Sequence, residues 1–169
     1  MTTQKDELLD WLNDAYAMEN GLVTVLRQHA KQAESQSDIA SRLEGHADVT
    51  QRHADMVRGC IESLGGSVSA LKTGIAEVMG VVKGASTVLA SDNLVKNTLA
   101  DIATEHFEIA CYTSLIAGAQ HVGATDVVEV CSRILAEEQA MAGWLEANIG
   151  QITVVYLQSV SPSSASATA

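Results

Sequence analysis

The chain contains a single proline in 169 residues, and that proline, Pro162, lies close to the C-terminus. A proline inside a helix removes a backbone hydrogen bond and collides with the preceding turn. Its absence from residues 1–161 therefore permits long, uninterrupted helices. Aromatic residues make up only 4% of the chain, and β-branched residues alternate as in a strand only weakly, near residues 152–156. The sequence predicts an all-α protein.

Four long segments have the apolar periodicity of amphipathic helices, and they span residues 4–32, 38–64, 91–122 and 125–149. Ser37 stands where a serine cap would begin the second segment. Glycines follow the other segment ends, at Gly65, Gly123 and Gly150. Because glycine adopts the left-handed conformation that ends many helices, we expect each of them to terminate a helix.

Residues 67–90, between the second and third helices, are rich in glycine and small side chains. We expect a long connection there that contains one short helix, at residues 69–82. Two antiparallel helix pairs joined by one long crossover form the ferritin-like four-helix bundle. The sequence therefore predicts such a bundle for residues 1–150. The remaining residues, 151–169, end in a serine- and alanine-rich stretch and are predicted to form a disordered C-terminal extension.

The charge of the chain narrows the classes of partner. Lysine and arginine number 10 against 21 acidic residues, a formal net charge of −11. Such a surface repels phosphate backbones and anionic lipids, so we expect no nucleic-acid partner and no membrane association. Three widely spaced cysteines do not form a disulfide framework, and the first residues lack the apolar run of a secretory signal. We expect a cytoplasmic protein.

Ionisable side chains interrupt the apolar stripes of the predicted helices. Glu19 stands in the stripe of the first helix, His46 and His53 in that of the second, and Glu138 in that of the fourth. The third helix has an apolar stripe that places His106 inward, and its members are Val95, Leu99, Ile102, His106, Ile109, Thr113 and Ile116. On that helix, Glu105 and Tyr112 lie at the edge of the stripe and Glu108 lies further round.

These residues have two interpretations. A buried carboxylate without a partner is costly, so it requires a partner, a proton or a metal ion. Carboxylates and imidazoles that project from four helices into one core hold iron or manganese pairs in bundle proteins. Each residue alone is more often a satisfied core or interface group. The usual Glu-x-x-His pair is also missing, since Met141 follows Glu138 by three positions and Thr50 precedes His53 by three.

The same segments resemble the YciE/YciF-type ferritin-like proteins, a bacterial family of unknown function that is linked to stress responses. The resemblance covers about residues 9–145, falls in order on all four helices and is carried by AYAMENGL (15–22), HADVT (46–50), CIESLGG (60–66), EHFEIACY (105–112) and ILAEEQAM (134–141). It implies a ferritin-like bundle, a homodimer, and a di-iron or di-manganese centre. Carried over position by position, it suggests a ligand set of Glu19, His46, Glu105, Glu108 and Glu138, to which His53 is added by its place on the inward stripe.

The chain departs from this family at two positions. Val49 stands where family members usually have a glutamate, and His53 stands where many have a glutamine. Two hypotheses follow. In the first, the protein binds a di-metal centre and serves in stress protection, with oxygen or peroxide chemistry at the metals and Tyr112 near them. In the second, it is a metal-free structural or interaction module that dimerises through an apolar face near Trp11 or Trp144.

Overall fold

The computed structural model of the chain describes residues 2–68 and 94–159. Its four helices are α1 (Gln4–Gln32), α2 (Ser37–Ser63), α4 (Leu94–Val122) and α5 (Thr125–Ser159). The described residues contain no strand, so the predicted all-α class is confirmed. The short helix predicted at residues 69–82 and the predicted start of the third helix at residues 91–93 lie outside the described residues.

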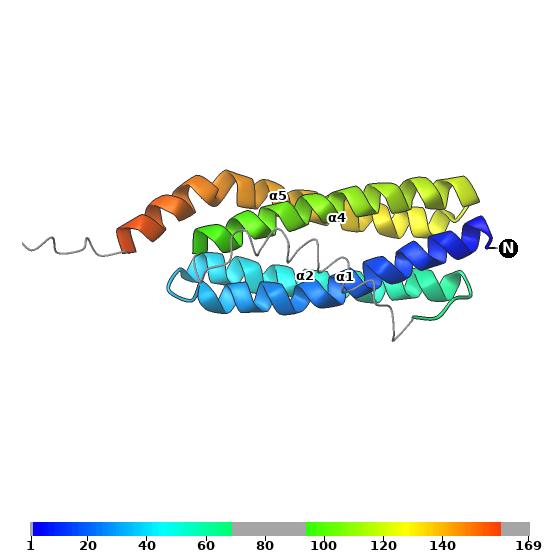
Figure 1. The fold of residues 1–169 in the computed structure, drawn as a ribbon, viewed down its shortest axis with the longest axis horizontal. Coiled ribbons are helices and arrows are strands. Elements are labelled where there is room, and N and C mark those ends of the chain that lie inside the picture. The colour runs from blue at the N-terminus through cyan, green and yellow to red at the C-terminus, as the bar shows by residue number, and fades with distance from the viewer. Residues whose placement is uncertain (1, 69–93, 160–169) are drawn as a thin grey trace, which may run out of the picture.

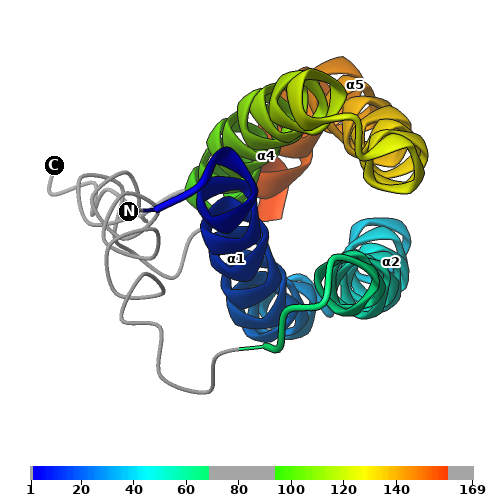
Figure 2. The same cartoon turned by 90° about the vertical axis from the view of Figure 1, so that its right-hand side faces the viewer.

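The four helices lie side by side along one axis (Figure 1). α1 and α2 form one antiparallel pair, and α4 and α5 form the other. Viewed along the bundle, α1 lies between α2 and α4, while α5 follows α4 (Figure 2). Contacts of α1 with α4 and of α2 with α5 close the arrangement. Each helix therefore has one face toward a shared core, and its middle residues meet those of the other three helices.

Local interactions at the helix ends explain where the helices begin and stop. Thr3 and Asp6 form a capping box at the start of α1, in which each side chain accepts a hydrogen bond from the other residue's backbone N–H, at 2.8 and 3.2 Å. Gly65 and Gly123 have φ angles of 76° and 75° just beyond α2 and α4, as predicted for glycine terminators. The predicted serine cap of α2 is wrong, because Ser37 is already helical and the capping residue is Gln36, without a side-chain cap hydrogen bond.

The predicted end of the fourth helix at Ile149 is also wrong. α5 passes through Gly150, which has no positive φ, and continues to Ser159. A glycine inside a helix costs only about 1 kcal/mol relative to alanine. Burial of Ile152 against the apolar cluster at this end of the bundle, where Tyr156 also packs, offsets that cost. Residues 151–159 are therefore helical rather than part of a disordered extension, and residues 160–169 lie outside the described residues.

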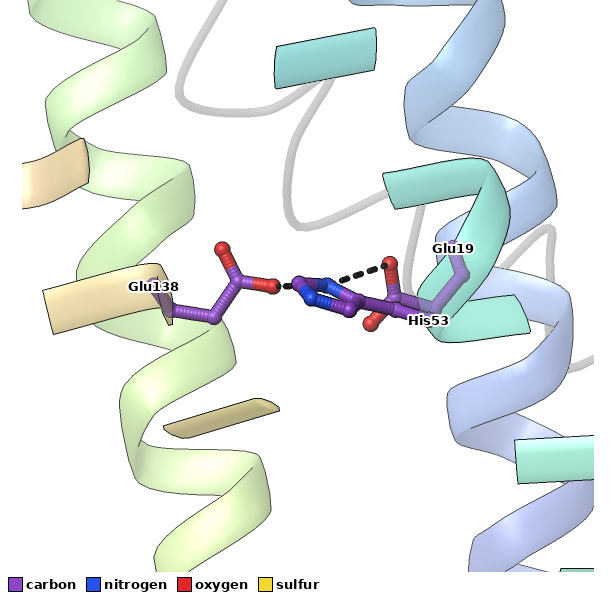
Figure 3. Close-up of side chains that lie close together, drawn as sticks. All are labelled: Glu19, His53 and Glu138. Carbon is purple, nitrogen blue, oxygen red and sulfur yellow. Dashed lines mark ion pairs between the residues drawn. The ribbon is translucent and has the colours of Figure 1, made fainter. Parts of the chain in front are cut away.

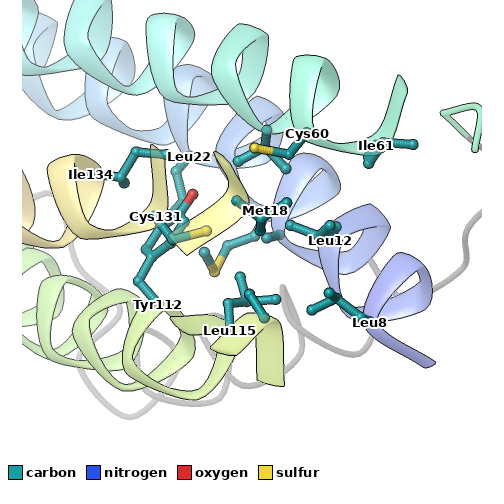
Figure 4. Packing of buried hydrophobic residues seen from close by; sticks show 14 residues of the cluster. Leu8, Leu12, Met18, Leu22, Cys60, Ile61, Tyr112, Leu115, Cys131 and Ile134 are labelled. Carbon is teal, nitrogen blue, oxygen red and sulfur yellow. The ribbon is translucent and has the colours of Figure 1, made fainter. Parts of the chain in front are cut away.

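Two apolar clusters fill the core. The first lies toward the α1 N-terminus, draws on all four helices (Figure 4) and includes Leu8, Leu12, Met18, Ile61, Leu115 and Ile134. The second lies toward the other end of the bundle and includes Leu26, Leu43, Met141, Leu145 and Ile152. Most of the buried residues between these two groups along α2 and α4 are polar, so the helices hold a polar middle layer between two apolar ends.

Within the two described ranges, no helix combines the length and the apolar composition that crossing a membrane requires.

We expect the Leu12→Ala variant to lose about 2–5 kcal/mol of unfolding free energy, because Leu12 is 0% exposed in the first cluster and its removal leaves a cavity. Leu157→Ala is the matched control, since Leu157 is 63% exposed and its loss should change stability by no more than about 0.5 kcal/mol. Urea denaturation of both variants measures the difference. Equal midpoints would contradict the core assignment.

Candidate metal centre

The polar middle layer contains every site residue that the sequence analysis proposed as a ligand. Glu19 of α1, His46 and His53 of α2, Glu105 and Glu108 of α4 and Glu138 of α5 are all buried, with at most 6% of each residue exposed. Four helices thus bring six ionisable side chains into one water-poor region. Ionisable groups are seldom buried unless they are paired or bound to a metal.

The third helix differs from its prediction, and the difference concerns His106. His106 is exposed and pairs with Glu146 at the surface, with 2.7 Å between His106 Nε2 and Glu146 Oε1. Leu99, assigned to the same inward stripe, is 41% exposed. The buried face of α4 is instead polar, with Asp101, Glu105, Glu108 and Tyr112 at spacings of four, three and four. Apolar periodicity indicated the wrong face because the buried face of this helix carries acidic residues in its middle.

The first group of potential ligands consists of Glu19, His53 and Glu138. Figure 3 shows the imidazole of His53 between the two carboxylates, which come from α1 and α5. His53 Nδ1 lies 2.7 Å from Glu138 Oε1 and 3.9 Å from Glu19 Oε2. One ligand atom from each residue fits within a region 4.8 Å across.

The second group consists of His46, Glu105 and Glu138, and its potential ligand atoms also lie within 4.8 Å of one another. His46 Nε2 lies 3.2 Å from Glu105 Oε1 and 3.4 Å from Glu138 Oε2. Glu138 therefore belongs to both groups and presents a different oxygen to each histidine. Such a carboxylate is suited to bridge two metal ions.

Glu108 belongs to neither group of three, yet it lies near both. Burial raises the pKa of its carboxyl well above the usual value, and the charges of Glu138, Glu19 and Glu105 raise it further. Its Oε1 atom is buried and has no hydrogen-bond partner. Glu108 thus adds a fourth carboxylate to the centre.

Many polar atoms of this layer lack hydrogen bonds. Among the described residues, the buried side-chain atoms without a partner are Glu19 Oε2, His46 Nε2, His53 Nδ1, Asp101 Oδ2, Glu105 Oε2, Glu108 Oε1 and both oxygens of Glu138. Except for the Asp101 oxygen, all belong to the six proposed ligands. Several lie within ion-pair distance of one another without the alignment of a hydrogen bond. Buried polar atoms are normally paired, so this set fits side chains arranged around an ion.

Protons balance the charge of the metal-free centre. Burial, followed by the charge of Glu138, raises the pKa of Glu19 to about 8. Burial also raises the pKa of Glu105 to about 7, although His46 opposes it. Burial alone would lower the pKa of His46, but the adjacent carboxylates of Glu105 and Glu138 outweigh it and raise that pKa to about 10. Near neutral pH, protons therefore occupy groups that a metal ion would otherwise bind.

The pKa of Glu138 is shifted in the opposite direction. Burial alone would raise the pKa of its carboxyl, but the adjacent imidazoles of His46 and His53 outweigh it and lower that pKa to about 2. The shared carboxylate therefore stays ionised while its neighbours hold protons. Pairs of groups whose environments separate their pKa values are typical of functional sites.

Two further residues hold the proposed ligands in position. The hydroxyl of Tyr112, which is fully buried, donates a hydrogen bond to Glu19 Oε1. The other ring nitrogen of His53, Nε2, lies 2.9 Å from Glu137 Oε2, and this contact directs Nδ1 toward the centre. The sequence analysis placed Tyr112 near the site but did not identify Glu137. Adjacent to Glu138, Glu137 lies off the inward stripe, and only the tertiary structure brings it to His53.

Val49 and Met141 occupy positions next to the centre without supplying an oxygen or nitrogen ligand. Both line an open groove of about 810 Å³ between α2 and α5, and His46 also contributes to its wall. The groove therefore approaches the buried centre from the α2/α5 side.

We expect the melting temperature of the metal-free protein, in chelator, to fall as pH rises from 5 to 8. Glu19 and Glu105 have folded pKa values of about 8 and 7, above the ordinary value of 4.5, so the folded state binds more protons in this window. Stability then decreases with rising pH. Glu138 has the opposite effect, but only between about pH 2 and 4.5. Glu19→Gln, which cannot ionise, should flatten the fall, and an equally steep fall in this variant would contradict the assignment.

Comparison with known proteins identifies the family. The sequence profile described as "Domain of unknown function (DUF892)" matches residues 3–158. Protein YciF of Escherichia coli (strain K12) is 25% identical over 147 residues, which are 83% of this chain and 86% of that protein. The crystal structure of YciF, described there as a stress protein, has a TM-score of 0.75 at 20% identity and covers 95% of this chain and all of its own.

Two other solved structures share the fold. A protein of Xanthomonas campestris pv. campestris has a TM-score of 0.78 and 29% identity, over 92% of this chain and 97% of that one. A bacterioferritin of Desulfovibrio desulfuricans, described with a diiron site, has a TM-score of 0.72 and 22% identity, over 92% of this chain and 86% of that one. These likenesses confirm the predicted ferritin-like bundle and the resemblance to YciF, and the profile match shows that the chain belongs to the DUF892 family.

Proposed function

We propose that the protein binds two divalent metal ions, iron or manganese, in the buried centre, with Glu138 between them. The observation that carries the proposal is the sharing of Glu138 by two buried groups of three. Glu19 and His53 would complete one group, and His46 and Glu105 the other. The bacterioferritin with the described diiron site has the same fold, which makes a di-metal centre the natural interpretation of this arrangement.

The donor set fits these metals in type and in charge. Carboxylate oxygens and imidazole nitrogens suit iron and manganese. The four carboxylates carry four negative charges when ionised, which two divalent cations neutralise, while the histidines bind in their neutral form. Val49 adds no ligand where family members usually have a glutamate, but Glu108 supplies a further carboxylate to the centre.

The protein's own residues would exclude water and fix the ligands. The apolar clusters on either side keep the layer dry, Tyr112 holds Glu19, and Glu137 holds His53. When bound, a redox-active metal pair supplies electron transfer to oxygen or peroxide. We propose that this serves stress protection in the cytoplasm, by a homodimer, and YciF's description as a stress protein supports such a role.

Elemental analysis of protein expressed with iron and manganese should find about two metal ions per chain. The double variant Glu19→Gln with Glu138→Gln should bind almost none, because it removes one ligand from the first group and the shared one from both. The variant Glu62→Gln with Glu129→Gln is the matched control, since both residues are exposed and the charge change is the same. Unchanged uptake by the first variant would overturn the ligand assignment.

We expect Glu137→Ala to weaken metal binding by about 10–100-fold, the usual effect of losing a carboxylate that orients a histidine ligand. Glu137→Gln should recover much of the affinity, because its amide oxygen can still accept the hydrogen bond from His53 Nε2. Competition with a chelator of known affinity measures both, and Glu129→Ala on the exposed face of α5 is the control. Equal affinity of Glu137→Ala and the wild type would contradict a role for this contact.

The second candidate function is a metal-free structural or interaction module. Val49 and Met141 favour it, because neither offers the oxygen or nitrogen ligand typical of a di-metal bundle at its position. Thermal melting with and without chelator separates the two functions. A bound metal stabilises the folded state by linkage, so chelation should lower the melting temperature only in the first case.

A further inference from the structure

A hydrogen-bonded pair, His29 and Asp101, lies next to the centre. Nδ1 of His29, on the last turn of α1, lies 2.7 Å from Oδ1 of Asp101 on α4. The side chains are 14% and 4% exposed, so His29 touches solvent while Asp101 lies behind it. The pair joins α1 to α4, on the side of the bundle away from the groove between α2 and α5.

Asp101 has a second oxygen that the pair leaves unused. Oδ2 of Asp101 is buried and has no hydrogen-bond partner. A cavity of about 10 Å³ adjoins this residue, and it is lined by Asp101, Thr104, Glu105 and Glu108 of α4 and by Leu22, Val25 and Leu26 of α1. That volume holds about one water molecule. Glu105 and Glu108 also each have a buried oxygen without a partner, so three carboxylates with free acceptor capacity line the α4 side of one small space.

These carboxylates form a row from the surface to the metal centre. Asp101, Glu105 and Glu108 follow at spacings of four and three, which places them on one face of α4 with roughly 5–6 Å between successive Cβ atoms. Carboxylate oxygens are ligands that hard divalent cations prefer. A cation that leaves solvent beside His29 would therefore meet a carboxylate at each turn of α4, opposite the apolar side chains of α1 that line the small cavity.

The opposite side of the centre offers no such row. The groove between α2 and α5 reaches His46, but Arg42 and Arg52 line it together with Asp38 and Glu137. The Arg42 guanidinium lies over the Trp144 ring, 5.3 Å from its centroid, and among the described residues neither arginine has a carboxylate within ion-pair distance. The groove therefore carries two positive and two negative side chains, and it presents no series of neighbouring carboxylates to a dication.

We propose that Asp101 is an outer site for a divalent cation, through which the ion passes from solvent beside His29 to Glu105 and Glu108. The inference rests on the proposed function, because the route would deliver metal ions to the same buried centre. It assigns to the Asp101–His29 pair a role in loading the metal, distinct from holding it there.

Loading of Co²⁺ into chelator-stripped protein, followed by stopped-flow absorbance, tests the route. Asp101→Asn should load at least tenfold more slowly than the wild type, with the same stoichiometry at equilibrium. Val25→Ile should also slow loading, because Val25 lines the small cavity and the added methyl group fills it without changing any charge. A melting curve for each variant shows whether it is folded. If Asp101→Asn is destabilised, the loading rate of Val25→Ile provides the test.

Two control variants should load at the wild-type rate. Glu34→Gln removes one negative charge from an exposed position, and Val49→Phe narrows the groove between α2 and α5. Wild-type loading rates in both Asp101→Asn and Val25→Ile would overturn the inference, as would slow loading in Val49→Phe alone. A wild-type protein that takes up no Co²⁺ would overturn the proposed function itself, whereas normal uptake with unaffected variants overturns only the route.

Discussion

The structure depends on how four carboxylates are accommodated inside a helix bundle. Moving one ionised carboxylate into an apolar interior is prohibitive unless it is paired, protonated or bound to a metal. Glu19, Glu105, Glu108 and Glu138 meet there, and His46 and His53 provide the only imidazoles of the group. In the metal-free centre the protons are unequally distributed among the carboxylates: Glu138 is ionised between two histidines, and the other acids have raised pKa values and favour the protonated form. In the proposed function, metal cations would replace those protons.

The rest of the fold supports this polar layer. Apolar clusters on either side give the bundle its hydrophobic stabilisation, so the layer itself need not provide it. The carboxylates are also held by residues outside the ligand set. Tyr112 bonds to Glu19, and Glu137 reaches across from α5 to His53 on α2. Such contacts restrict the rotamers of buried ligands and make the centre a fixed arrangement.

The polar layer differs between its two sides. Toward α1 and α4, carboxylates continue from the centre to Asp101 and the partly exposed His29. Toward α2 and α5, the wide groove beside Val49 carries charges of both signs and reaches only His46. A hard cation and a neutral small molecule would thus meet different surfaces on their way to the same centre. The substitution of valine for the family's usual glutamate lies on the groove side.

The helix pattern of this protein could be predicted from its sequence, and so could most of the ionisable residues that are buried in its core. The absence of proline, the glycine terminators and the apolar spacing determined four helices, and single charged residues on apolar stripes identified Glu19, His46, His53 and Glu138. This method failed on α4, where the buried face is the polar one and His106 faces solvent. Periodicity assumes that the more apolar face is buried, and that assumption fails for a helix that brings two proposed ligands and Asp101 to the core.

Only the tertiary structure determined the contacts between residues of different helices. Local sequence could not show that α5 continues past Gly150, because the stabilisation comes from packing of Ile152 against another part of the chain. Nor could it show that Glu138 presents one oxygen to each of two histidines, that Glu137 orients His53, or that Asp101 pairs with His29. The sequence by itself determined which residues are available on each helix. Distances across the bundle depend on how the helices pack, and those distances decide which residues form a site.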